Sequence, residues 1–265
     1  MAAESKIDPM HQFLVEPLFG RHLVVAGYDI SFTNSALWML ITLVILYIFM
    51  MGGMKRELVP GRWQAAVEGV TGFITGMMNT NIGPEGRKFT PYVFSLFMFI
   101  LVANLLGLVP IGIFSPITDA AHPFTVTSHF SVTGVLAILS FSIVLIVGFW
   151  RHGLHFFSLF IPHGTPKVMI PLIAPIEFIS FMVRPFSLGL RLFVAMIAGH
   201  ILMKVFGSFI ITGLNGGIGT GLLVSVPSFL LIVGISALEL LVAAIQAYVF
   251  ALLTSLYLND AVNLH

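Results

Sequence analysis

Long apolar runs separated by short polar segments dominate the chain, and their lengths predict how it lies in a membrane. An apolar run of about 20 residues is long enough to span a bilayer as a helix. Three runs of roughly this length predict membrane-spanning helices at 35–54, 89–114 and 131–150. Two later runs, 168–206 and 222–258, are much longer. The pattern therefore predicts an all-α integral membrane protein with five membrane-embedded helices.

The last two runs are too long to cross a membrane upright. As helices they would measure about 58 and about 55 Å, whereas a hydrocarbon core is about 30 Å thick. Dividing either run into two spans would require a polar turn near its middle, and neither run has one. Pro185 alone would kink the helix rather than end it. We therefore expect two steeply tilted helices that form a hairpin through the Gly-rich segment 214–221.

Residues 60–83 have a different pattern, with apolar side chains at three- and four-residue steps and polar side chains on the other side. The apolar set comprises Trp63, Val67, Val70, Phe73, Ile74, Met77 and Met78. This spacing predicts an amphipathic helix that lies in the membrane interface. Packing of the same face on another protein surface is an alternative, and both can hold. Segments 1–34 and 259–265 are predicted to be polar tails.

Composition supports the membrane assignment and excludes several other classes. Of 265 residues, 58% are hydrophobic and 9% are charged, whereas a soluble domain has about 25% charged residues. The net charge of +1 gives no basis for nucleic-acid binding through a basic surface. The chain has no cysteine, which excludes disulfides and thiolate metal sites. No nucleotide motif or metal-ligand cluster is evident, so we expect no cofactor and no metal.

The distribution of Lys and Arg predicts the orientation. Basic residues fall in the segments between the first and second spans and between the third and fourth, namely Lys55, Arg56, Arg62, Arg87, Lys88, Arg151 and Lys167. Loops 115–129 and 207–221 contain none. Basic loops face the cytoplasm. We therefore expect the N-terminus outside and the C-terminus inside.

Charged residues within the fourth apolar run are the main candidates for function. An arginine at bilayer depth costs at least about 2.5 kcal/mol and cannot lose its charge. Glu177, Arg184 and Arg191 are each seven residues apart and form one helical stripe. We expect a structural or assembly role for Arg184 and a functional role for Arg191. His200 follows Arg191 by nine residues and therefore faces the opposite way.

The fifth run carries Glu239 and Gln246, again seven residues apart. In an antiparallel hairpin, facing positions sum to roughly 435–440. His200 is then level with Glu239, and Arg191 is level with Gln246. A His–Glu pair can exchange protons near neutral pH, whereas the fixed positive charge of Arg191 can attract a carboxylate on another subunit.

The His200–Glu239 pair forms one polar layer and Arg191 with Gln246 forms a second. Together these two layers are the parts of a gated proton conduit. A self-contained proton antiporter or channel and a structural membrane scaffold are the alternatives. The absence of internal repeats argues against a transporter, and the titratable pair argues against a scaffold.

Four segments resemble one known family. They are NLLGLVP at 104–110, FTVTSH at 124–129, PIEFISFMVRPFSLGLRLFVAMIAGH at 175–200 and ELLVAAIQAYVFALLTSLYL at 239–258. The sequence is similar to subunit a of the F-type ATP synthases, especially those of alphaproteobacteria and mitochondria. The resemblance implies a non-catalytic stator subunit that carries protons past a rotating c-ring in two offset half-channels, which couples the proton-motive force to ATP synthesis. It also implies b-type peripheral stalk subunits and membrane lipid as further partners, and a location in the bacterial inner membrane in preference to the mitochondrial inner membrane.

The resemblance assigns roles to individual residues. Arg191 falls on the essential arginine that faces the c-ring carboxylate, and Gln246 falls on its neighbouring glutamine. His200 and Glu239 fall on positions associated with the outer half-channel. Apart from the resemblance, we expect Asn104 and Glu177 to complete the proton path, with Glu177 at the inner exit.

The sequence departs from the family pattern at two positions. Ala195 stands where the family usually has Asn, and Val126 stands where Pro is common. The Ala195 departure puts in doubt any role for a polar side chain next to Arg191.

Overall fold

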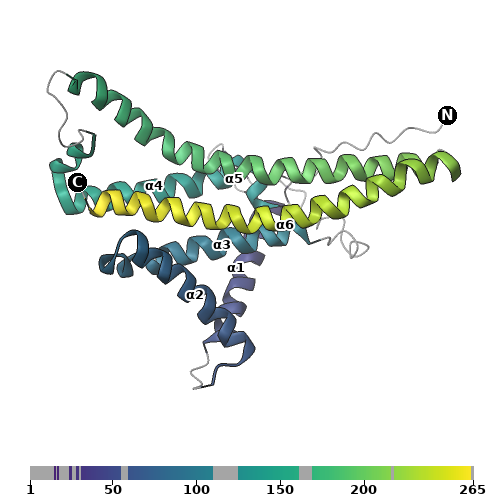
Figure 1. The fold of residues 1–265 in the computed structure, drawn as a ribbon, viewed down its shortest axis with the longest axis horizontal. Helices are drawn as coiled ribbons and strands as arrows, with labels where there is room; N and C mark the ends of the chain where they lie inside the picture. Colours follow the sequence, from purple (N-terminus) through teal and green to yellow (C-terminus); the bar gives the residue numbers. More distant parts are fainter. Residues whose placement is uncertain are drawn as a thin grey trace. The chain divides into compact units, whose positions relative to one another are not determined.

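The computed structural model describes residues 15, 17, 24–25, 28–29, 31–54, 59–109, 125–160, 169–215 and 218–263 (Figure 1). The helices in this part are α1 (Asn34–Gly53), α2 (Arg62–Asn81), η2 (Pro84–Lys88), α3 (Thr90–Leu108), η4 (Val126–Ser128), α4 (Phe130–His152), η5 (Gly153–Phe160), α5 (Ile170–Asn215) and α6 (Ile218–Val262). Helices α1, α3, α4, α5 and α6 are long and apolar enough to cross a membrane. The predicted all-α membrane protein with five such helices is confirmed.

Two short strands precede the helices. β1 (Val24–Val25) pairs antiparallel with β2 (Tyr28–Asp29). The segment 1–34, predicted as a tail, thus contains a small hairpin. At its end Thr33 and Asn34 cap α1, because the Asn34 side chain accepts a hydrogen bond from the Ser35 N–H at 2.8 Å and the Thr33 carbonyl accepts one from the Leu37 N–H.

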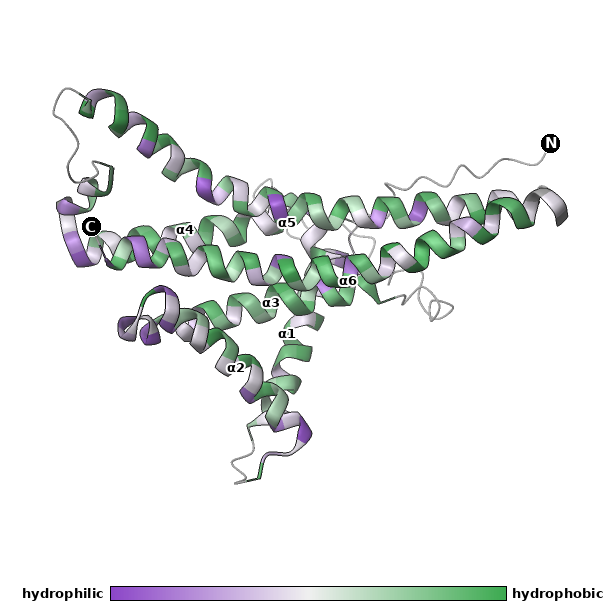
Figure 2. Ribbon diagram, viewed as in Figure 1, coloured by the Kyte–Doolittle hydropathy of each residue, from purple (hydrophilic) through white to green (hydrophobic). Residues whose placement is uncertain are grey.

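The two long helices are continuous. α5 has 46 residues and runs through Pro175 and Pro185, and α6 has 45 residues and runs through Pro227. The prediction that Pro185 would not end the helix is therefore confirmed. Figure 2 shows that both helices are apolar along most of their length. No membrane is present in the structure, so their tilt stays a prediction.

The ends of α5 and α6 differ from the predicted ranges. α5 extends beyond residue 206 to Asn215, and α6 begins at Ile218 rather than at 222. Most of the predicted Gly-rich turn is therefore helical. A single glycine inside a helical pattern is tolerated at a cost of about 1 kcal/mol, so the glycines of this segment do not by themselves end the helices. α6 also ends at Val262, which places part of the predicted 259–265 tail in the helix.

The three single spans and α2 also begin and end within a few residues of the predicted ranges, with one larger difference. α3 ends at Leu108, whereas the predicted span ran to 114, and residues 110–124 lie outside the described part of the chain. Three of the basic residues used to predict orientation also lie outside the described part of the chain, namely Lys55, Arg56 and Lys167.

The residues form two compact units, each described here by itself. The first unit comprises Met1–Leu43, Leu101–His129 and Phe193–Ile245. In it the later half of α5 packs on the earlier half of α6. Ser225 donates a hydrogen bond to the Ile210 carbonyl, and Ser236 contacts Met203 Sδ at 3.5 Å. The end of α3 and the segment 125–129 complete this unit.

The second unit comprises Val44–Ile100, Phe130–Leu192 and Gln246–His265. Phenylalanine rings join α4, η5 and α5, with Phe156 and Phe160 each packed on Phe181. α4 and α5 approach closely because Gly189 has no side chain, and a Cβ there would lie 3.2 Å from the Thr133 carbonyl oxygen. Tyr92 on α3 shares a hydrogen bond with Ser140 on α4.

Helix α2 packs within the second unit on one face. Its buried residues are Gln64, Val67, Ile74 and Met78. Asn81 donates a hydrogen bond to Ser255 of α6 at 2.6 Å, and Trp63 Nε1 donates one to the Phe49 carbonyl of α1. Part of the predicted amphipathic face thus packs on this chain itself. Its position at a membrane interface stays a prediction.

Candidate functional site

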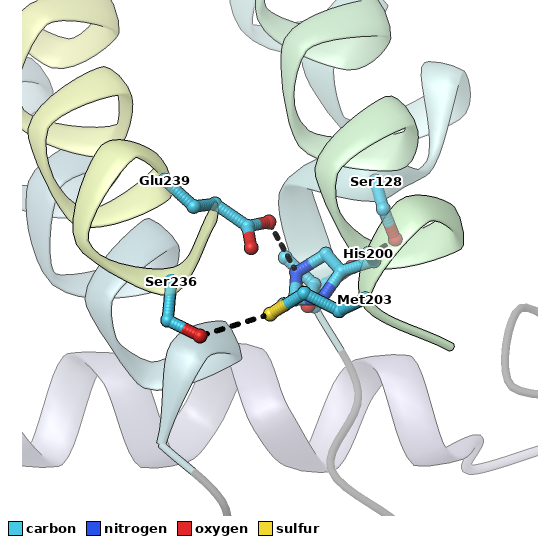
Figure 3. Close-up of polar contacts among 6 residues, drawn as sticks. Ser128, His200, Met203, Ser236 and Glu239 are labelled. Atoms are coloured by element: carbon cyan, nitrogen blue, oxygen red, sulfur yellow. Dashed lines mark hydrogen bonds and ion pairs between the residues drawn. The ribbon is translucent and has the colours of Figure 1, made fainter. Parts of the chain in front are cut away.

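A buried histidine and a buried carboxylate meet in the first unit. His200 of α5 and Glu239 of α6 point toward one another (Figure 3), with 3.7 Å between His200 Nε2 and Glu239 Oε1. The side chains are 9% and 2% exposed. This contact agrees with the hairpin register predicted from sequence. An ionisable pair so well shielded inside membrane helices is expensive to keep, which marks it as a functional candidate.

The Glu239 carboxylate occupies a space that a glycine provides. A Cβ at Gly199, the residue before His200, would lie 2.5 Å from Glu239 Oε1. Neither carboxylate oxygen has a hydrogen-bond partner among the described residues. The Glu239 carboxylate instead lies 3.7 Å from His200 Nε2, a distance that a modest side-chain movement can close.

A third polar residue, Thr125, contacts the His200–Glu239 pair and was not predicted from the sequence. Thr125 Oγ1 shares a hydrogen bond of 2.7 Å with His200 Nε2. Thr125 precedes η4 and is 75 residues from His200 along the chain. The signal for it in the sequence was weak: three hydroxyl residues, Thr125, Thr127 and Ser128, stand together between two apolar runs.

Asn104 of α3 contacts the same stretch of α6. Its Nδ2 donates a hydrogen bond of 3.1 Å to the Ala243 carbonyl, one turn after Glu239. The residue is fully buried, and its Oδ1 has no hydrogen-bond partner in the described part of the chain. The structure thus brings the predicted path residues His200 and Glu239 into contact and places Asn104 against the next turn of α6, all within the first unit.

Arg191 is in a different setting. Its side chain is exposed on α5, and it makes no hydrogen bond or ion pair with any residue that the structure describes. Val194, Ala198 and Leu202, which continue the same helical stripe, are also exposed. Arg191 therefore lies on an open, apolar face, while His200 is buried, as their nine-residue spacing requires. Gln246 of α6 is half-buried, and its predicted level with Arg191 stays a prediction.

Arg184, in contrast to Arg191, has ion-pair partners within the described part of the chain. Its Nη1 lies 2.8 Å from Asp260 Oδ2, and its Nη2 lies 3.8 Å from Glu177 Oε1. The guanidinium also stacks on Tyr257, 5.2 Å from the ring centroid. Asp260 was missed because the sequence predicted a tail from residue 259. The ion pair ties α5 to α6, which supports the predicted structural role of Arg184.

No metal centre is apparent in this arrangement. Among the described residues, no group of three or more His, Asp or Glu side chains is placed to hold a metal ion.

These features define a class of protein: a multi-pass helical membrane protein with a buried His–Glu pair between two of its helices and an exposed arginine on an apolar face. The sequence matches the family model described as ATP synthase A chain over residues 36–259. The chain belongs to this family. It is therefore a multi-pass membrane protein of ATP synthesis and proton transport.

Curated relatives match along the full chain. "ATP synthase subunit a" of Rhizorhabdus wittichii is 71% identical, with 100% of each chain covered. The subunit of the same name from Zymomonas mobilis is 61% identical, again with 100% of each chain covered. That of Rhodospirillum rubrum is 44% identical over 97% of this chain and 99% of its own.

Proposed function

We propose that the chain translocates protons through two offset half-channels at its interface with a rotating c-ring. Protons enter from the outside through the layer of His200 and Glu239 and load a c-ring carboxylate. The ring then turns until that carboxylate meets Arg191, where it releases its proton to the inner half-channel. Gln246 lies beside the arginine, and Glu177 forms the inner exit.

The buried His200–Glu239 contact is the observation that carries this proposal. A titratable pair at bilayer depth is costly to retain, and such residues mark proton relays in membrane proteins. The Glu239 carboxylate lacks competing hydrogen bonds in the described structure. It is therefore available to take a proton from His200 and pass it on.

The exposure of Arg191 supports the second half of the mechanism. A guanidinium stays charged at any physiological pH. Since it has no ion-pair partner among the described residues, its charge is available to a carboxylate of a neighbouring subunit. It stabilises the ionised form of that carboxylate and thereby favours proton release. The same charge repels protons and separates the two half-channels.

Energetics require several protons for each ATP. A unit charge that falls through 100 mV yields about 2.3 kcal/mol, so one proton cannot drive a phosphorylation. The phosphorylation takes place elsewhere in the complex, and this chain is its non-catalytic proton path. Its further partners are b-type peripheral stalk subunits. It lies in the bacterial inner membrane with its basic loops and C-terminus inside.

The test is ATP-driven proton pumping in inverted membrane vesicles that contain the assembled complex. Arg191→Ala, His200→Ala and Glu239→Ala should each abolish or strongly reduce pumping while the chain remains assembled. Gly207→Ala is a matched control on α5, because nothing lies within 4 Å of the added Cβ. If all three variants pumped like the control, the proposal would be wrong.

The alternative of a self-contained proton antiporter or channel makes the opposite prediction for the isolated chain. Reconstituted into liposomes without a c-ring, this chain should give no coupled proton flux. Flux that persists without other subunits, and that is lost in Arg191→Ala, would favour the alternative.

A further inference from the structure

Thr125 is held more firmly than a loop residue ordinarily is. Its carbonyl accepts hydrogen bonds from both the backbone N–H and the hydroxyl of Ser128, at 3.1 and 2.6 Å. The side chain is 6% exposed. This turn of η4, immediately before α4, fixes the position from which the Thr125 hydroxyl reaches His200. Figure 3 draws Ser128 and His200 together with the contacts of the site.

A glycine on α3 makes room for this threonine. A Cβ at Gly107 would overlap Thr125 Oγ1 and would lie 2.5 Å from Cγ2 and 2.8 Å from Cβ. The Thr125 side chain is therefore packed between α3 and α5. Three separate segments of the chain, around residues 107, 125 and 200, converge on one hydroxyl group.

His200 Nε2 faces two groups at once. Thr125 Oγ1 is 2.7 Å away and Glu239 Oε1 is 3.7 Å away. A hydroxyl both donates and accepts hydrogen bonds, whereas an ionised carboxylate accepts only. Thr125 can therefore accept from Nε2–H when that nitrogen is protonated, and donate to Nε2 when it is not. It stays bonded to the ring in both protonation states.

We propose that Thr125 is a positioning residue for the proton-exchanging pair: its hydroxyl holds the His200 ring so that Nε2 stays within reach of Glu239 before and after each proton transfer. In the transfer Nε2–H gives up its hydrogen bond to Thr125 Oγ1, the Nε2–H bond of the imidazolium breaks and an O–H bond forms at Glu239 Oε1. Thr125 then donates a hydrogen bond from its hydroxyl to the unprotonated Nε2. The ring keeps its other proton on Nδ1, and Thr125 has the same number of protons throughout. The inference rests on the proposed function of His200 and Glu239.

The chain offers a matched pair of variants. Thr125→Val removes the hydroxyl but keeps the branched shape. Thr127→Val makes the same change in the same turn, at a fully buried residue whose Oγ1 has no hydrogen-bond partner among the described residues. Removing an unsatisfied buried hydroxyl should cost little. Thr125→Ser, which keeps the hydroxyl, is the rescue variant.

The experiment measures ATP-driven proton pumping in inverted vesicles, normalised to the amount of assembled chain, across a range of pH. Thr125→Val should pump about two- to tenfold more slowly, which corresponds to one lost hydrogen bond. Its pH profile should also shift, because His200 loses a partner that it has in both protonation states. The other titratable groups on these segments, Lys204, His129 and Glu239, are unchanged in every variant. Thr127→Val and Thr125→Ser should match the unmodified chain in rate and profile.

Two outcomes overturn the inference. The first is pumping by Thr125→Val at the rate and with the pH profile of Thr127→Val. The second applies if Thr125→Val does not assemble. Thr125→Ser is then compared with Thr125→Cys, because cysteine has nearly the shape of serine but carries a thiol that forms only weak hydrogen bonds. Equal pumping by these two variants refutes the positioning role.

Failure of the proposed function would look different. In that case His200→Ala and Glu239→Ala would themselves pump normally in the same vesicles. If these two variants lose pumping while Thr125→Val does not, the inference about Thr125 alone is wrong.

Discussion

Gly199 gives a direct way to disturb the His200–Glu239 contact without removing either group. Replacing Gly199 with alanine adds one methyl group next to His200. An ideal Cβ at this position would lie 2.5 Å from Glu239 Oε1, 2.7 Å from Cδ and 3.2 Å from Cγ. The Gly199→Ala variant therefore presses on the carboxylate while every titratable group of the site remains.

The size of the effect follows from these distances. Ordinary van der Waals contact begins near 3.4 Å, so the carboxylate oxygen must move by about 0.9 Å. Glu239 is 2% exposed and has little space in which to move. Overpacking a well-filled interior costs about 1–3 kcal/mol. If this cost falls on the proton-loading step, pumping slows by about 5- to 150-fold.

The assay is again ATP-driven proton pumping in inverted vesicles, with the assembled chain quantified by immunoblot. Gly207→Ala is the control, because nothing lies within 4 Å of its added Cβ. Alanine is favoured over glycine in a helix by about 0.5–1 kcal/mol, so helix propensity cannot explain a loss in either variant. The reasoning fails if Gly199→Ala assembles and pumps as fast as Gly207→Ala.

Two further predictions concern ion pairs in the second unit. Asp260→Asn should lower the thermal midpoint of the purified complex by an amount equivalent to about 1 kcal/mol, because Arg184 then loses its 2.8 Å partner and both groups are partly exposed. Glu177→Gln should lower the thermal midpoint less, because Glu177 lies 3.8 Å from the Arg184 guanidinium. Equal decreases in the two variants would contradict the conclusion that Asp260 is the main partner of Arg184. The hydrogen bond from Arg151 lowers the pKa of the Glu85 carboxyl below its ordinary 4.5. The contact therefore stabilises the fold above that value and is lost as the pH falls through the lower folded pKa. Between about pH 6 and about pH 3, the thermal midpoint of the unmodified complex should fall more steeply than that of the Glu85→Gln variant. Parallel curves of thermal midpoint against pH would show that the Glu85–Arg151 contact does not contribute.

The number and type of membrane helices could be predicted from sequence because they depend on local properties. Apolar run length sets whether a helix can span a bilayer, and the lack of a polar turn within the last two runs correctly predicted continuous helices through Pro185. Helix ends were less predictable. A glycine inside a helical pattern is tolerated at a cost of about 1 kcal/mol, so it does not by itself mark where a helix ends.

Helical spacing also determined part of the candidate site. Nine residues between Arg191 and His200 place them on opposite faces, and the hairpin register places His200 beside Glu239. These inferences need only the fixed geometry of one helix and of two helices joined by a short connection.

Only the tertiary structure decided which other residues meet this pair. Thr125 reaches His200 across 75 residues of chain, and Asp260 reaches Arg184 across 76. Gly107 and Gly199 matter because of the side chains that occupy the space they leave. Such contacts depend on how separate segments pack together, and no periodicity along a single segment encodes them. The sequence by itself therefore determined the helices and the side of each helix on which the charged residues lie. The packing decided which residues from other segments contact them.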